Sequence, residues 1–200
     1  MWRKNRISTS NLLEKATAIL LRRIPLTDTS LIVHWSTAEH GLVRTAARGA
    51  RRPGSAYSGK LDLFYRAEIT FTRSRRGDLH ALREIDVQDY RRGLQENYGR
   101  ILCASYFARL LEMVAEPEAP MPELHDLLER AYGFLSGNDA SLVAVRHFER
   151  EVARNLGIFP SGKTPAIGAL RQMLHKEPEQ RAALLRHLGE QGRSESGGGE

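Results

Sequence analysis

The residues best suited to chemistry in this chain are the cations of one loop. The segment 48–60 reads RGARRPGSAYSGK and combines Arg and Lys with glycines and one tyrosine. Cations neutralise phosphates, glycine lets the backbone approach closely, and an aromatic ring can stack on a base. The combination favours a surface that holds nucleic acid by its backbone, and the alternative is a flexible, solvated loop. The side chains concerned are Arg48, Arg51, Arg52, Tyr57 and Lys60.

The basic charge of the chain is confined to its first half. Residues 1–90 contain 16 Lys and Arg against 9 Asp and Glu, a balance of +7, whereas residues 91–200 contain 14 against 15, a balance of −1. Such an asymmetry predicts two units, of which one faces a polyanion. A second basic segment, with Arg73, Arg75 and Arg76, would extend the same surface if the fold brings it beside the loop.

No motif in the chain predicts catalysis. The stretch GSAYSGKL at 54–61 nearly matches a phosphate-binding P-loop, but Leu61 stands where Ser or Thr would bind magnesium. A strand pattern also begins there, where the P-loop requires a helix. The seven histidines lack the i, i+4 spacing of a helical metal pair, and no G-x-S-x-G motif is present. We therefore expect a protein that is not an enzyme and that holds no cofactor and no metal.

Composition predicts a folded protein of a reducing compartment. The hydrophobic fraction is 41% and the charged fraction is 27%, which is ordinary for a globular chain. Cys103 is the only cysteine, so the chain forms neither an intramolecular disulfide nor a Cys-rich zinc site. The longest apolar run, Ala16–Leu21, is far too short to span a bilayer. We expect a cytoplasmic protein that contacts no membrane.

The first half of the chain alternates apolar and polar residues with the period of two that strands show. The alternation is clearest from Leu61 to Thr72, and tight turns are predicted at Glu39–Gly41 and Arg75–Asp78. Five strands without a helix between them favour a closed barrel of the OB-fold type, because closure removes exposed strand edges. The strands are predicted over Thr17–Ile24, Leu31–Ser36, Gly41–Ala50, Leu61–Thr72 and Leu79–Val87.

The second half changes to the i, i+3/i+4 apolar spacing of helices. Three long helices are centred on apolar sets that begin at Ile101, Leu124 and Leu142, with Asp139 as the N-cap of the third. Two shorter helices follow over Pro165–Lys176 and Pro178–Leu188. The class is therefore α+β, a five-stranded OB-fold barrel followed by an all-α domain. The predicted units are an N-terminal extension 1–14, a nucleic-acid-binding barrel 15–90, a helical domain 97–188 and a disordered tail 189–200.

Several stretches, taken together, resemble the RecO family of recombination mediators. The runs AILLRRIPLTDTSLIV at 18–33 and EHGLVR at 39–44 resemble the opening of RecO, as do ARGARR at 47–52 and LDLFY at 61–65. The likeness extends from about Lys15 to Pro160, where LGIFP at 156–160 follows a helix of the family.

This resemblance implies a function in DNA repair. Members of the family bind single- and double-stranded DNA, anneal complementary strands and load RecA onto SSB-coated DNA, which places them at the nucleoid. The implied partners are RecR and the acidic C-terminal tail of SSB. The resemblance assigns DNA contact to the matching cations Arg22, Arg23, Arg44, Arg48, Arg51 and Arg52, whereas Tyr57, Lys60, Arg73, Arg75 and Arg76 rest on the physical argument alone.

Two features depart from the family pattern. Many members carry a four-cysteine zinc insertion after this point, but here SGKTP at 161–165 leads directly into predicted helices without a cysteine, which excludes zinc on ligand count. The helical part is also short, and the surface for SSB is harder to place. An acidic tail with an apolar end favours a cation beside a hydrophobic groove. Arg146, Arg150 and Arg154, spaced i, i+4 and i+8, supply such cations unless they are ordinary surface charges.

Two other interpretations of the sequence stay open. The first is an RNA-binding or structural OB-fold module whose helical half mediates assembly, and the second is a hydrolase with an unrecognised site. A preference for structured RNA over single-stranded DNA would favour the first.

Overall fold

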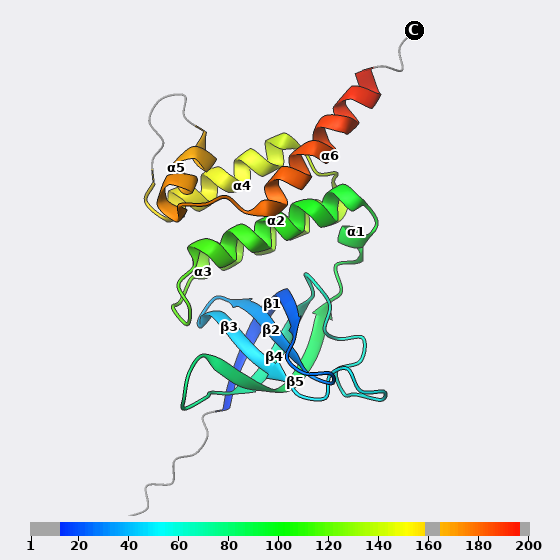
Figure 1. Ribbon diagram of the computed structural model, residues 1–200, viewed down its shortest axis with the longest axis vertical. Coiled ribbons are helices and arrows are strands. Elements are labelled where there is room, and N and C mark those ends of the chain that lie inside the picture. Colours follow the sequence, from blue (N-terminus) through cyan, green and yellow to red (C-terminus); the bar gives the residue numbers. More distant parts are fainter. Residues whose placement is uncertain (1–12, 159–164, 197–200) are drawn as a thin grey trace, which may run out of the picture.

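The computed structural model describes residues 13–158 and 165–196, in which a β-barrel lies below a layer of helices (Figure 1). The barrel strands close in the order β1-β2-β3-β5-β4, and every pair is antiparallel except β3 with β5. This closed five-stranded barrel is the OB-fold that the alternation predicted. Its strands are β1 (Leu13–Pro25), β2 (Leu31–Thr37), β3 (Gly41–Ala47), β4 (Arg66–Thr72) and β5 (Leu79–Asp89).

The helices pack around a core of leucines and aromatic rings, in which Phe107 and Phe148 stack with centroids 3.9 Å apart. The predicted cap of the third long helix is wrong, because the helix begins only at Leu142. Ser141 directly precedes it and its Oγ accepts a hydrogen bond from the Ala144 amide at 3.2 Å. The helices are α1 (Arg92–Gln95), α2 (Tyr98–Val114), α3 (Pro122–Gly137), α4 (Leu142–Asn155), α5 (Ala166–Leu174) and α6 (Glu179–Ser196).

Two predicted boundaries at the chain ends are also wrong. β1 begins at Leu13 rather than Thr17, since Leu13 pairs with Thr72 of β4, and the N-terminal extension is shorter than 1–14. Residues 1–12 lie outside the described part. At the other end, α6 continues to Ser196, so the disordered tail predicted from Gly189 is wrong that far. Glu, Gln and Arg in this stretch are good helix formers, which allows the helix to continue; residues 197–200 lie outside the described part.

The strand predicted over Leu61–Thr72 begins only at Arg66. Phe64 has a left-handed backbone with φ of 71°, and its amide donates to the Leu20 carbonyl at 2.8 Å. This conformation turns the ring away from the barrel and into the helical core, where it packs edge-on against Tyr132 with centroids 5.4 Å apart. Burial of the ring, which is 3% exposed, offsets the strain of a positive φ at a non-glycine residue.

The connection between α2 and α3 is bound to the tip of the β2–β3 hairpin. Gly41 has a φ of 65°, and a Cβ there would lie 1.9 Å from the Ala119 carbonyl oxygen, so only glycine fits. The Met121 amide donates to the Ala38 carbonyl at 3.0 Å. Barrel and helices are therefore joined by backbone contacts at the hairpin as well as by the chain itself.

Candidate nucleic-acid interface

The basic loop between β3 and β4 is held to the barrel by hydrogen bonds. The Arg51 amide donates to the Thr29 carbonyl at 2.9 Å, and the Gly49 amide donates to Ser30 Oγ at 3.2 Å, so the loop is tied to the β1–β2 turn. Within the loop, successive turns are closed by i+3 amide bonds. Three glycines spaced five residues apart adopt φ of 69° or 70°, which these turns require, namely Gly49, Gly54 and Gly59. These hydrogen bonds define one backbone conformation of the loop, whose residues are mostly exposed.

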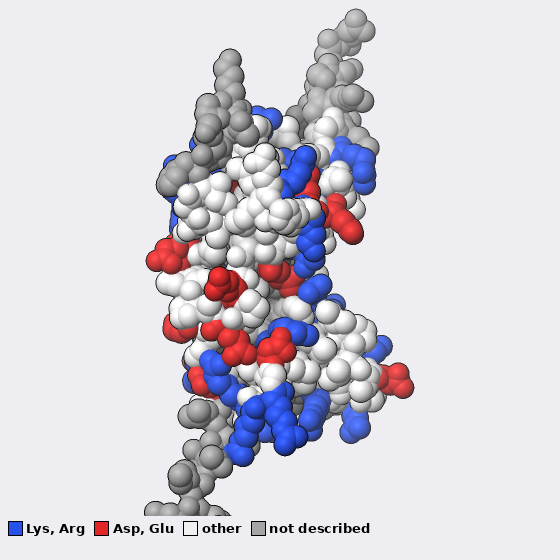
Figure 2. All heavy atoms as spheres, turned by 60° about the vertical axis from the view of Figure 1, so that its left-hand side comes forward, with Lys and Arg blue, Asp and Glu red and all other residues white. Residues whose placement is uncertain are grey.

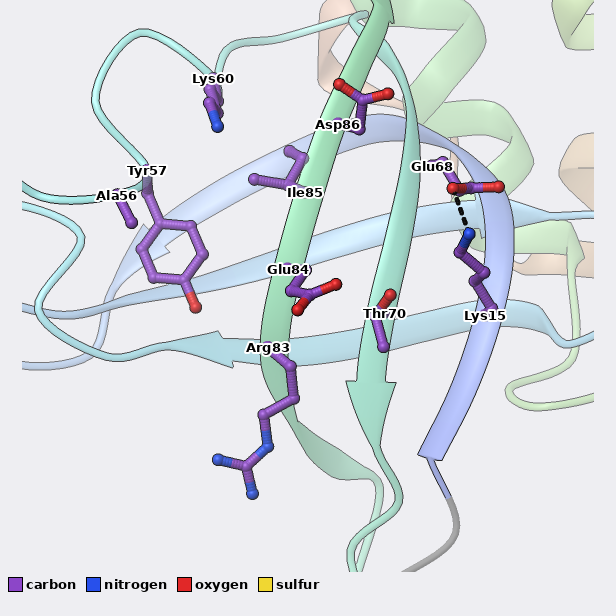
Figure 3. Close-up of a pocket in the computed structure, with 10 residues that line it drawn as sticks. All are labelled: Lys15, Ala56, Tyr57, Lys60, Glu68, Thr70, Arg83, Glu84, Ile85 and Asp86. Carbon is purple, nitrogen blue, oxygen red and sulfur yellow. Dashed lines mark ion pairs between the residues drawn. The ribbon is translucent and has the colours of Figure 1, made fainter.

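Tyr57 joins this loop to the outer face of β5. Its Oη donates to the Leu82 carbonyl at 3.0 Å, which fixes the half-buried ring. The ring lines two adjacent clefts of about 350 and 280 Å³, and Arg83 lines both as well. The two clefts share these two side chains, and together we call them the barrel groove; Figure 3 shows the 350 Å³ cleft. The barrel groove is lined by Lys15, Ala46, Arg48, Ala56, Tyr57, Lys60, Glu68, Thr70 and residues 81–86.

The basic end of the barrel groove contains Arg48, Tyr57 and Arg83. Arg83 projects outward from β5, and its Nε donates to Thr72 Oγ1 at 2.8 Å (Figure 3). Sequence reasoning missed Arg83 because it belongs to no motif. The signal was its outward position in a predicted strand, but only the fold reveals that the basic loop crosses that strand.

The other end of the barrel groove carries carboxylates. Lys15 forms an ion pair with Glu68 at 2.5 Å, and this hydrogen bond raises the pKa of Lys15 (Figure 3). Glu84 and Asp86 project from β5 nearby. Phosphates are attracted to the Arg48–Arg83 end and repelled from the Glu84–Asp86 end, so the charge gives the groove a direction.

The remaining loop cations and Arg23 lie at the surface of the barrel. Arg51 and Arg52 are exposed, and Lys60 lies in the wall of the barrel groove on the loop side. Arg23 forms an ion pair with Asp62 at 3.1 Å and donates to the Leu61 carbonyl at 2.7 Å.

The structure does not bring the β4–β5 hairpin beside the basic loop, because the two lie on opposite sides of the barrel (Figure 1). Arg73 is paired with Glu14 at 2.9 Å and with Glu118 at 2.8 Å, so two carboxylates neutralise it. Arg75 and Arg76 are exposed on the hairpin. On the face that Figure 2 presents, Lys and Arg gather over the lower barrel, and Asp and Glu lie mostly where barrel meets helices.

Arg22 and Arg44 lie outside the barrel groove. Both line a separate cleft where the barrel meets α2, together with Arg109 and Glu112. Sequence reasoning missed Arg109, because helical spacing marks it only as a surface residue of α2.

A second surface feature lies between α3 and α4. An apolar groove of about 360 Å³ contains Phe134 and Val143, both exposed, with Arg130 and His147 as its basic side chains. We call it the helical groove. None of the predicted SSB-binding arginines lines it: Arg146 and Arg150 are exposed elsewhere on α4, and Arg154 pairs with Glu151 at 2.9 Å.

Within residues 13–158 and 165–196, no group of three or more His, Cys, Asp or Glu side chains is arranged to hold a metal ion. In the same residues, no helix has the length and apolar character needed to cross a membrane.

Comparison with known proteins gives the family. Residues 12–91 match the family described as Recombination protein O N terminal, and residues 95–176 match Recombination protein O C terminal. The chain is 31% identical to the DNA repair protein RecO of Rhodopirellula baltica over 144 residues, which cover 72% of this chain and 53% of that protein. It is 32% identical to the DNA repair protein RecO of Anaeromyxobacter dehalogenans over 146 residues, covering 73% of this chain and 58% of that protein. The chain thus spans little more than half the length of these relatives. It belongs to the RecO family.

Proposed function

We propose that this chain acts in DNA repair as a mediator without a catalytic site. It binds single- and double-stranded DNA, anneals complementary strands and, with RecR, helps to load RecA onto SSB-coated DNA. Its relatives are named DNA repair proteins, and RecR enters on family membership alone. The observation that carries the proposal is the basic end of the barrel groove, where Tyr57 is fixed beside Arg48 and Arg83.

This end of the groove favours binding that does not depend on the base sequence. Guanidinium groups attract phosphates, and a fixed aromatic ring stacks on any base. A strand held by its backbone and by one stacked base keeps its other base edges free to pair. That geometry favours annealing, which needs two strands to be neutralised and brought together while their bases remain available.

The proposal is tested by annealing complementary oligonucleotides precoated with SSB. Wild-type protein should accelerate annealing without ATP, and the triple variant Arg48→Ala, Arg51→Ala, Arg52→Ala should lose most of this activity. A matched control removes three exposed helix arginines, Arg92, Arg171 and Arg186, and should anneal like wild type. The proposal is overturned if wild type does not anneal, if the loop triple variant is as active as wild type, or if structured RNA is preferred to single-stranded DNA.

We propose that the tail of SSB binds in the helical groove rather than on the arginine stripe of α4, which consists of Arg146, Arg150 and Arg154. An acidic peptide with an apolar end needs an apolar cleft with positive charge beside it. The helical groove offers Phe134 and Val143 for the apolar end and Arg130 for a carboxylate. Arg130 is itself paired with Asp126 at 2.8 Å on the exposed surface, where such a pair is weak.

A labelled SSB tail peptide distinguishes the two sites. Val143→Asp places a carboxylate in the groove at a residue that is 78% exposed, so the fold should tolerate it and peptide affinity should fall at least tenfold. Met173→Asp, an exposed apolar residue of α5, is the matched control. If Arg150→Ala loses binding while Val143→Asp binds normally, the tail binds on the arginine stripe and not in the helical groove.

A further inference from the structure

Three arginines from three different elements line one cleft between the barrel and α2. Arg22 comes from β1, Arg44 from β3 and Arg109 from α2, and the cleft has a volume of about 360 Å³. We call it the junction cleft. Arg109 is the basic side chain that the helices add to it.

Two carboxylates hold these arginines in place. Glu112, which is 6% exposed, accepts a hydrogen bond from Arg109 at 3.2 Å and lies 3.4 Å from Arg22 Nε. Asp78 accepts a hydrogen bond from Arg44 at 2.6 Å. Three guanidinium groups therefore face two carboxylates, which leaves one positive charge in excess.

Both carboxylates are ionised at neutral pH. Burial raises the pKa of Glu112, but the hydrogen bond from His34, the charge of Arg22 and the hydrogen bond from Arg109 outweigh it, so the pKa lies below its ordinary value. The hydrogen bond from Arg44 lowers the pKa of Asp78. Because ionised Glu112 can only accept, His34 Nδ1, 2.9 Å away, carries the proton of that contact.

The guanidinium groups have donor capacity that the carboxylates do not use. Each carries five N–H donors in a planar fork that matches a phosphate. The buried Nε of Arg44 has no hydrogen-bond partner in the described part of the chain, and that of Arg22 has only the 3.4 Å ion-pair contact with Glu112. Buried donors without acceptors are unfavourable. A phosphate that enters the cleft brings acceptor oxygens and matches its excess positive charge.

Strand β3 connects the junction cleft to the barrel groove. Arg44 lines the junction cleft, whereas Ala46 and Arg48 line the barrel groove, and alternate residues of a strand point to the same side. At about 3.3 Å per residue, Arg44 and Ala46 are separated by about 7 Å along β3, which ends at Ala47, and Arg48 follows directly in the loop. One nucleic acid strand can therefore contact both sites at once, whereas a free small anion would occupy only one of them.

We infer that the junction cleft binds a backbone phosphate of the nucleic acid strand held in the barrel groove, with Arg109 as a contact from the helical part. This inference rests on the proposed function. The bound strand then crosses from the barrel onto α2. Arg22 and Arg44 belong to a second phosphate site, distinct from that of the loop arginines.

The salt dependence of binding to single-stranded oligo-dT tests the role of Arg109. Arg109→Gln should lower the steepness of log Kd against log salt by about 0.7 and weaken binding about fivefold at 0.1 M salt, because each phosphate contact on a single strand contributes about that much. Arg109→Lys should keep the wild-type slope, since it keeps the charge, and shows that the site still folds. Arg186→Gln on α6 is the charge-matched control and should behave as wild type.

The results separate the two claims. If wild type fails to bind oligo-dT, the proposed function and this inference both fail. If wild type binds with a steep slope but Arg109→Gln matches it, the inference alone is overturned.

A cysteine probe locates the strand directly. Pro117 is an exposed residue in the wall of the junction cleft. In Pro117→Cys the introduced thiol is the reactive one, because Cys103 is buried and burial raises its pKa to about 12. Oligo-dT should protect the thiol of Pro117→Cys from alkylation, and inorganic phosphate should not. The thiol of the control variant Arg186→Cys should stay unprotected. Equal alkylation with and without oligo-dT would contradict the inference, and protection by inorganic phosphate alone would indicate a small-anion site instead.

Discussion

At the scale of single residues, Tyr57 depends on a strand remote in sequence for its position. The loop supplies the ring, but the Leu82 carbonyl of β5 fixes it through one 3.0 Å hydrogen bond. Burial raises the pKa of Tyr57, so the hydroxyl stays protonated and can donate at any physiological pH. A fixed ring loses little freedom when a base stacks on it, which favours binding.

Substitutions at Tyr57 should separate the contribution of its ring to DNA binding from the contribution of its hydroxyl to stability. Tyr57→Ala should weaken oligo-dT binding by about 1–3 kcal/mol, because stacking is lost. Tyr57→Phe keeps the ring, so binding should change much less, while the lost hydrogen bond should lower the free energy of unfolding by about 1 kcal/mol. Fluorescence anisotropy and urea unfolding measure the two effects. Tyr98→Ala, at an exposed ring outside the groove, is the control, and equal binding by Tyr57→Ala and wild type would exclude stacking.

At the scale of elements, α6 is attached to the helical core by a buried charged group. Arg181 donates to Glu149 Oε1 at 2.7 Å, and Tyr106 Oη donates to the same oxygen at 2.7 Å. Glu149 is 1% exposed, so its charge is tolerable only while these donors are present.

Removing one partner should therefore cost more than removing both. Arg181→Met leaves the buried carboxylate of Glu149 with only Tyr106, and should lower the free energy of unfolding by about 3–5 kcal/mol. Adding Glu149→Met should restore part of the loss. Urea denaturation of the two single variants and the double variant completes the cycle. Strictly additive losses would mean that the two residues do not interact.

At the scale of the whole molecule, a half-buried histidine lies where the barrel meets the helices. His125 of α3 has its Nδ1 2.9 Å from Ser36 Oγ of β2. Burial lowers the pKa of His125, and this outweighs the attraction of Glu129 and Glu39 for its charged form. His125 is therefore neutral at neutral pH.

This gives the stability a defined pH dependence. The unfolded chain takes up a proton at His125 below about pH 6.5, whereas the folded state resists it. The unfolded state then binds more protons, so the free energy of unfolding should decrease as the pH falls from 6.5 towards the lowered pKa. His125→Asn should reduce this decrease and His147→Asn, on the exposed face of α4, should not. Urea unfolding at pH 7.5, 6.5 and 5.5 measures it, and an unchanged pH dependence in His125→Asn would contradict the assignment.

The sequence predicted the class of fold well, because each half has its own apolar period. It failed where tertiary contacts override that period. Alternation placed Phe64 on the polar side of a strand, but the hydrogen bond to Leu20 and the ring contact with Tyr132 hold it in the helical core. No local pattern contains that information.

The candidate site was predictable as a set of cations but not as a surface. Local sequence indicated Arg48 and Tyr57, which the structure places in one groove. It grouped them with Arg73, whose neutralising partners Glu14 and Glu118 are distant in sequence. Arg83 and Arg109 were missed. Arg83 joins the site only because the loop crosses β5, and Arg109 only because α2 packs on the barrel.

The central claim is that the basic loop and the barrel groove hold a nucleic acid strand by its phosphates. The most direct measurement is the affinity for oligo-dT between 50 and 500 mM salt, compared in wild type and in the triple variant of Arg48, Arg51 and Arg52. About five phosphate contacts on a single strand predict that log affinity falls with log salt with a slope between about −3 and −4 for wild type. In the triple variant this slope should be less steep by about 2. A wild-type slope near zero, or an equal slope in both proteins, would contradict the account.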